Sequence, residues 1–240
     1  MSVQAQTRDS DLSITARGNL RESQVEASGA WKIGGDSAGR AEIRFSRISI
    51  ASLQDLVMLD RKAPPPAVEG FIEGSATVNI ALEKPREFRA EVRLTTVQVN
   101  PKENPAPRLG LKPEEIVLRN SQPVVLDVSA DSATVRAARF TGRNTQMDVA
   151  GTVPFNTRAG VDLTVRGDID LVILQLLRSD LQASGNATVN ASIRGSLQDP
   201  NVIGQLSFAA LRCICPTCRT TSIMRLERFP STVAARPSNS

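Results

Sequence analysis

Three cysteines within six residues, Cys213, Cys215 and Cys218 in the stretch CICPTC, form the densest set of metal-binding side chains in this sequence. As thiolates they could bind zinc or an iron–sulfur cluster. A closed tetrahedral site needs a fourth ligand, however, and the chain contains neither a histidine nor a fourth cysteine. An Asp, a Glu or a partner chain would have to complete the site. The sequence therefore predicts no metal centre and no cofactor.

Acid–base catalysis has equally little support. The 240 residues include no His, which removes the side chain whose pKa suits proton transfer near neutrality and excludes Ser-His-Asp and Cys-His arrangements. Paired carboxylates occur at Glu114 and Glu115 and at Asp168 and Asp170, in segments where we expect a polar loop or turn at the solvated surface. No Gly-rich phosphate loop follows a predicted strand into a helix. We therefore expect a protein that is not an enzyme.

The net charge of +4 lies in the C-terminal tail. From Arg212 onward the chain has five basic residues and one acid, so the preceding 211 residues are neutral, with both signs interspersed. Such a body offers no basic stripe that could follow phosphates, and no aromatic residues alternate with basic ones. We expect no nucleic-acid partner. No apolar run approaches the ~20 residues of a membrane span, and the polar first ten residues lack the apolar core of a signal peptide.

The elements that would position any site are strands. Apolar and polar residues alternate with a period of two in many short segments, which predicts a mainly β fold. Within 40–50 the phase changes between Phe45 and Ile48, which predicts a bulge or a bend. Helical spacing predicts two short helices at 52–60 and 168–177, and the Pro-rich segment 100–115 is predicted to be a loop. The expected strands lie at 11–18, 28–35, 40–50, 74–82, 88–94, 123–128, 133–140, 146–153, 161–166 and in a hairpin at 187–208.

That hairpin has the clearest pattern of the chain. It reads GNATVNASIRGSLQDPNVIGQLSF over 185–208, with apolar residues at every second position of its first strand and Asp199-Pro200 in the turn. Its opening hexapeptide, GNATVN, echoes GSATVN at 74–79, and each copy follows a Leu-rich segment. The echo indicates a loose internal repeat, with coincidence among common strand residues as the alternative.

The hairpin 183–208, the hexapeptide GTVPFN at 151–156 and the spacing of the strands resemble the TamB/AsmA-like family of bacterial envelope proteins. Over residues 1–211 this resemblance implies an elongated, curved, β-taco-like sheet whose open groove carries phospholipid acyl chains. It also implies a periplasmic protein, anchored in the inner membrane, that serves protein secretion and outer-membrane assembly and pairs through a C-terminal region with an outer-membrane β-barrel. Family members are longer and begin with a signal anchor, so we expect an interior fragment of such a protein.

If the resemblance holds, the groove is lined by inward-facing side chains of four strands: Val78, Ile80, Leu82, Ala90, Val92, Leu94, Val189, Ile193, Leu206 and Phe208. Alkyl chains would be stabilised there by ~0.8 kcal/mol per buried CH₂, without any charge or metal. Two alternatives stay open. The same faces could pack as an ordinary core, or the chain could be a passive structural or adhesive β-solenoid-like module without a ligand.

Residues 212–240 differ in composition from the rest, and we expect an aberrant, disordered, basic tail that contains the cysteines. One hypothesis is that this tail is out of frame. Read one base earlier, the codons for 227–232 permit GTVPFN, the hexapeptide present at 151–156, and those for 211–220 permit a family-like string. The alternative is a genuine Cys-rich segment, and resequencing of the DNA distinguishes the two.

Overall fold

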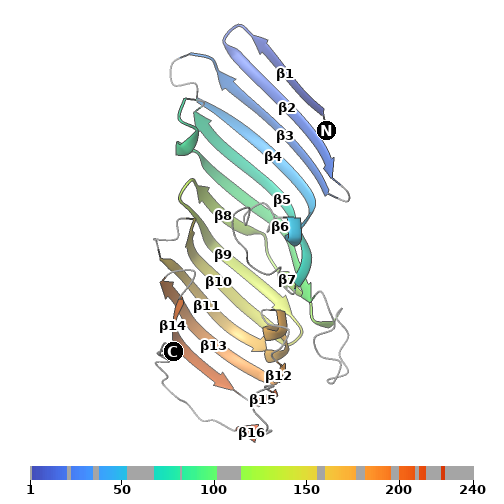
Figure 1. Cartoon of the computed structure of the whole chain (residues 1–240), viewed down its shortest axis with the longest axis vertical. Helices are drawn as coiled ribbons and strands as arrows, with labels where there is room; N and C mark the ends of the chain where they lie inside the picture. Colours follow the sequence, from blue (N-terminus) through green and yellow to red (C-terminus); the bar gives the residue numbers. More distant parts are fainter. Residues whose placement is uncertain are drawn as a thin grey trace, which may run out of the picture.

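The computed structural model describes residues 2–20, 23–34, 38–52, 68–81, 83–101, 115–155, 160–176, 182–195, 200–208, 211–214 and 223–224. Most of them lie in strands, and every strand pair is antiparallel. Thirteen strands form one large sheet and three form a small one. Figure 1 shows the large sheet as a long, twisted and curved ribbon of strands that runs from β1 to β14. The predicted mainly β fold, an elongated curved sheet with very few helices, is confirmed.

The large sheet is a meander in which most strands pair with the preceding and the following strand; β7 and β8 are the exception, since each lies between β6 and β9. Its strands are β1 (Ser2–Arg8), β2 (Asp11–Leu20), β3 (Ser23–Lys32), β4 (Ala38–Ser49), β5 (Val68–Ala81), β6 (Arg89–Pro101), β7 (Leu118–Asn120), β8 (Val124–Ser129), β9 (Ser132–Gly142), β10 (Thr145–Pro154), β11 (Val161–Asp170), β13 (Asn186–Gly195) and β14 (Pro200–Phe208). The small sheet contains β12 (Gln182–Ser184), β15 (Leu211–Ile214) and β16 (Ile223–Met224). Two 3-10 helices are described, η1 (Pro85–Glu87) and η4 (Leu171–Leu176), and residues 50–52 are helical.

Strand register sorts the side chains of the large sheet onto two chemically different faces. Ile43, Ala76 and Val92 stand directly opposite one another on β4, β5 and β6. Because successive side chains alternate between faces, the next row, Glu42, Thr77 and Glu91, lies on the other side. The apolar face includes Leu12, Ile14, Ala27, Trp31, Ala41, Ile43, Phe45, Ala76, Val78, Val92, Leu94, Leu126, Val135, Val149, Leu163, Val165, Ala191 and Ile193.

The opposite, polar face carries ladders of charged and hydroxyl side chains. Its members include Thr15, Arg17, Glu26, Ser28, Arg40, Glu42, Arg44, Ser75, Thr77, Asn79, Arg89, Glu91, Arg93, Asp127, Arg136, Arg139, Asp148, Asp162, Thr164, Arg166, Thr188, Asn190 and Arg194. Cross-strand pairs such as Arg17–Glu26 (3.4 Å) and Arg194–Asp162 (3.3 Å) bridge neighbouring strands. This face is solvated and holds the sheet together laterally.

Bulges bend the sheet without exchanging its faces. The bulge or bend predicted inside 40–50 is a β-bulge, because the β4–β5 register shifts between Phe45 and Ile48 and Arg47 adopts a φ of 51°. Ile48 pairs with Ile72 and returns to the apolar face. Further register shifts occur between β5 and β6, between β8 and β9, and between β9 and β10. Such bulges increase local twist and curvature.

The gap between β7 and β8 is bridged by one side chain. Both short strands pair with β6, and the bulge in β6 lies between them. The backbone N–H of Val97 donates to Asn120 Oδ1 at 2.7 Å, and Asn120 Nδ2 donates to the carbonyl oxygen of Thr95 at 3.0 Å. The amide of Asn120 therefore replaces the ladder hydrogen bonds that a continuous strand would supply here.

Several boundaries differ from the predicted ones. The helix predicted at 168–177 begins only at Leu171 and is a 3-10 helix, because Ile169 and Asp170 still pair with β13. Of the helix predicted at 52–60 only residue 52 is described. In the loop predicted at 100–115, Asn100 and Pro101 belong to β6, and 102–114 lie outside the described residues. Strand β1 was not predicted, since all seven of its residues are exposed and mostly polar.

Parts of the tail are described as strands. Leu211–Ile214 forms β15, whose Cys213 pairs through its backbone with Ala183 of β12, and Ile223–Met224 forms β16. Residues 215–222 and 225–240, which include Cys215 and Cys218, lie outside the described residues. The hypotheses of a disordered and out-of-frame tail therefore stay predictions.

Two glycines on the apolar face have backbone conformations in which any other residue would be strained. Gly151 and Gly167 have φ values of 133° and 142°, and a Cβ at either would collide with a carbonyl oxygen of the neighbouring strand. We expect Gly151→Ala and Gly167→Ala each to lower the free energy of unfolding by about 1–3 kcal/mol, measured by urea denaturation. Gly18→Ala, where nothing lies within 4 Å of the added Cβ, should be neutral or slightly stabilising. Equal losses of stability at all three positions would show that the positive φ and the close carbonyl oxygen do not cause the destabilisation.

Two arginine–carboxylate pairs on the polar face make stability depend on pH. Arg136 donates from two nitrogens to Asp127, both at 2.6 Å, and Arg139 binds Asp148 at 2.7 and 3.1 Å. These hydrogen bonds lower the pKa of Asp127 and the pKa of Asp148 from 3.8. A lowered pKa in the folded state means that the stabilisation is present above pH 3.8 and is lost as the pH falls through the lowered values.

We therefore expect the urea midpoint to fall between about pH 5 and about pH 2, and the fall to shrink in the variant Asp127→Asn/Asp148→Asn. Added salt should weaken the difference, because both pairs are exposed. An unchanged pH dependence in the double variant would assign the acid sensitivity to other carboxylates.

Candidate ligand-binding face

Most apolar-face side chains of β2 to β5 are only half-buried. In β3 the apolar-face residues Val25, Ala27, Gly29 and Trp31 are half-buried, and every intervening residue is exposed. From β1 to β5, Ala76 is the one described residue that is buried. Side chains in an ordinary core are closed off by a second layer. Among the described residues, Val68 at the start of β5 packs against the cluster around Val172, and no strand or helix supplies such a layer over the rest of β2 to β5.

The predicted groove residues fall on this one face but in two separate groups. Val78, Ile80, Ala90, Val92 and Leu94 lie half-buried on β5 and β6. Val189, Ile193 and Phe208 lie on β13 and β14, on the far side of β7 to β11. Leu82 lies outside the described residues, and of Leu206 only the backbone pairing with Val189 is described.

Sequence reasoning missed many residues of the same face. They include Trp31, Ile43, Phe45, Leu126, Val149 and Val165, all of which follow the alternation that identified the predicted set. The signal was therefore present, and it extends across the whole sheet.

One end of the apolar face is closed by η4. Leu171 and Val172 are buried, with Val172 packed against Ile116 and Leu118 beside the end of β6. A neighbouring cluster joins Leu171 to Ile169 and Ala187, and two of the predicted groove residues, Val189 and Phe208, pack against it. These two side chains belong to a small core at the closed end.

Asp170 holds η4 in place. It is 6 % exposed, so the expectation of solvated surface is wrong for this residue; Asp168 is exposed and accepts from Thr188 Oγ1 at 2.6 Å. Asp170 Oδ1 accepts from the N–H of Val172 (3.1 Å), and its own N–H donates to Thr145 Oγ1 (3.0 Å). Arg143 Nε lies 3.6 Å from Asp170 Oδ2. The start of η4 is thereby tied to the β9–β10 turn.

The other end of the face, where β4 begins and β5 ends, carries the single tryptophan. The indole of Trp31 lies over Gly29 of its own strand and Gly39 of β4, and a Cβ at either glycine would fall on the ring. Its Nε1 is buried and has no hydrogen-bond partner among the described residues. Large aromatic rings that cover cross-strand glycines are a known device of curved sheets.

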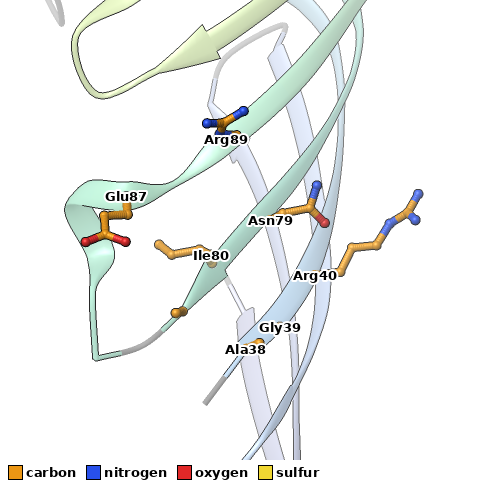
Figure 2. A pocket seen from close by; sticks show the side chains of 8 residues that line it. Ala38, Gly39, Arg40, Asn79, Ile80, Glu87 and Arg89 are labelled. Carbon is orange, nitrogen blue, oxygen red and sulfur yellow. The ribbon is translucent and has the colours of Figure 1, made fainter. Parts of the chain in front are cut away.

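A hollow of about 540 Å³ lies beside this end of the face. Ala38, Gly39, Ile80 and Ala81 line it with apolar surface, and Arg40, Asn79, Glu87 and Arg89 line it with polar groups. Figure 2 shows Ile80 on one side of β5, and Asn79 and Arg40 pointing to the other. The hollow therefore connects the apolar face to the polar one around the strand ends.

Other kinds of site find no support in the part of the chain that the structure describes. No group of three His, Cys, Asp or Glu side chains there could hold a metal ion. No described helix is both long and apolar enough to cross a bilayer. In the part of the chain that the structure describes, the fold defines a long antiparallel β-sheet with one apolar face, which η4 covers at one end and which is only half-buried elsewhere. Comparison with family models, curated proteins and solved structures finds no match.

The hydrogen bond between the N–H of Asp170 and Thr145 Oγ1 allows a test of what holds η4 on the sheet. Thr145→Val keeps the shape of the side chain but leaves the N–H of Asp170 without its acceptor. We expect a loss of about 1–3 kcal/mol in the free energy of unfolding, and faster hydrogen exchange in η4. Thr15→Val, on the exposed polar face, should change stability by less than about 0.5 kcal/mol. Equal losses in both variants would show that Thr145 does not hold the closed end.

Proposed function

We propose that the apolar face binds phospholipid acyl chains and that this chain is a segment of an envelope-spanning protein that shields lipids in transit. The observation that carries the proposal is the row of mostly half-buried apolar side chains over β2 to β6. Apart from the ends of β5 and β6, where Val68 and Val99 pack against the cluster around Val172, no described element covers this row. Contiguous apolar surface of this kind marks an interaction site, since leaving it in water is unfavourable.

Alkyl chains suit the chemistry of this surface. Their binding is non-directional and gains ~0.8 kcal/mol per buried CH₂, so it needs no histidine, metal or buried charge. On the apolar face of β4 to β6, the small side chains Ala41, Ala76 and Ala90 alternate with larger branched ones, which leaves room for an alkyl chain along the strands.

The resemblance of 151–156 and 183–208 to TamB/AsmA-like proteins points to the same ligand. On this proposal the parent protein is periplasmic, is anchored in the inner membrane and meets an outer-membrane β-barrel during outer-membrane assembly. No catalytic step is part of the proposal. In the alternative, a ligand-free structural module, the face would pack against protein; a β-helical solenoid would pair its strands in parallel, whereas the described pairs are antiparallel.

Trp31 is the only tryptophan of the chain and lies on the apolar face, so its fluorescence reports on that surface. We expect phospholipids with brominated acyl chains, presented in neutral detergent micelles, to quench Trp31. Ala27→Asp places a carboxylate on the apolar face of the same strand and should weaken binding at least about tenfold, because the charge would be desolvated. Mass spectrometry of extracts from the purified protein identifies the lipid.

Ser28→Asp is the matched control, since it adds the same carboxylate one residue further on, on the polar face. It should quench like the unmodified protein. A folded protein, β-rich by circular dichroism, that shows no quenching and carries no lipid would favour the structural module. Equal losses in both variants would mean that the binding does not use the apolar face.

A further inference from the structure

Two arginines flank one asparagine at the open end of the sheet. Arg40 of β4 and Arg89 of β6 both stand directly opposite Asn79 of β5. Side chains in directly opposed positions are about 5 Å apart at their Cβ atoms, so both guanidinium groups can reach the space above the Asn79 amide. All three side chains line the 540 Å³ hollow.

The local charges leave these arginines weakly compensated. Arg40 has Glu42 at 3.8 Å, and Glu87, the carboxylate of the hollow, has Lys84 at 3.7 Å. The guanidinium group of Arg89 forms no hydrogen bond or ion pair with any residue that the structure describes. Two like charges on either side of a neutral amide, in an exposed row, favour an anion between them.

The position of this row couples it to the apolar face. Gly39 and Ile80 precede or follow Arg40 and Asn79 in their strands and therefore lie on the apolar face, as Figure 2 shows for the side chain of Ile80. Both residues also line the hollow. Trp31 lies over Gly39 and extends the apolar surface. A molecule with an anionic group and an apolar chain can therefore reach both surfaces by passing around the strand ends.

We propose that Arg40, Asn79 and Arg89 bind the phosphate group of a lipid whose acyl chain lies on the apolar face. This inference rests on the proposed function and adds the residues that hold the phosphate group of the lipid. Guanidinium groups bind phosphate oxygens in a bidentate manner, and the Asn79 amide supplies a further donor. The phosphate stays at the solvated rim, where it keeps part of its hydration.

The sheet contains a matched control row. Arg44, Ser75 and Arg93 repeat the arrangement across the same three strands, on the same polar face. This row lies further from the strand ends and does not line the hollow. Removing its two charges changes the net charge by the same amount without touching the proposed site.

The experiment compares Trp31 quenching by brominated phosphatidic acid and by a brominated diacylglycerol with the same acyl chains. We expect Arg40→Gln/Arg89→Gln to weaken binding of phosphatidic acid at least about tenfold and to leave diacylglycerol binding unchanged. Arg44→Gln/Arg93→Gln should leave both unchanged. Inorganic phosphate, titrated calorimetrically, should bind far more weakly than phosphatidic acid.

The outcomes separate this inference from the function beneath it. Equal binding of phosphatidic acid and diacylglycerol would overturn the phosphate site and leave the acyl-chain function standing. Equal losses in the two double variants would reduce the effect to diffuse electrostatics and also overturn the site. Inorganic phosphate that binds as tightly as phosphatidic acid would replace the lipid with a free anion. Failure of both lipids to bind the unmodified protein would remove the proposed function itself.

Discussion

Every property of this sheet depends on the register between its strands. Side chains alternate with a period of two, so a slip of one residue in any pairing would move an entire apolar row into solvent. The chain meets this constraint even where bulges add a residue. Phe45 and Ile48, Leu94 and Val97, and Val135 and Ala138 are apolar residues three positions apart, and each spacing coincides with a register shift. The sequence changes phase wherever the backbone does, and the two faces stay separate.

The two ends of the apolar face differ because the connections differ. At one end η4 folds back over the sheet, and it is fixed there by buried hydrogen bonds of Asp170 and Thr145 and by the exposed guanidinium group of Arg143, which lies beside Asp170. At the other end, next to Trp31 and the arginine row, no described element folds back over the apolar face, and the described part of the β5–β6 connection is the short helix η1. On the proposed function, an amphiphile would enter at the end next to Trp31 and stop at the end that η4 closes.

Local pattern was sufficient to predict the strands, the bulge or bend at Phe45 and Ile48, and the common face of the groove residues, because alternation is a property of neighbouring residues. It was insufficient wherever contacts between distant segments decide. The burial of Asp170 depends on Thr145, and the packing of Val189 and Phe208 depends on η4, neither of which any local window contains. The stacking of Trp31 over Gly39 likewise requires the pairing of β3 with β4. Strand β1 was missed because its pairing with β2, not its composition, makes it a strand.

A meander that does not close into a barrel can contain any number of strands. In the described part of the chain β1 and β14 are the outer strands of the path, and they do not pair with each other. Each further hairpin would extend such a sheet by about 10 Å, at about 4.8 Å per strand, and would continue both faces without rearranging what is already there. The distance that a protein of this design can cover is therefore proportional to its number of hairpins. Its evolution to a new span would need duplication of a small unit, of which the paired hexapeptides in β5 and at the start of β13 have the form.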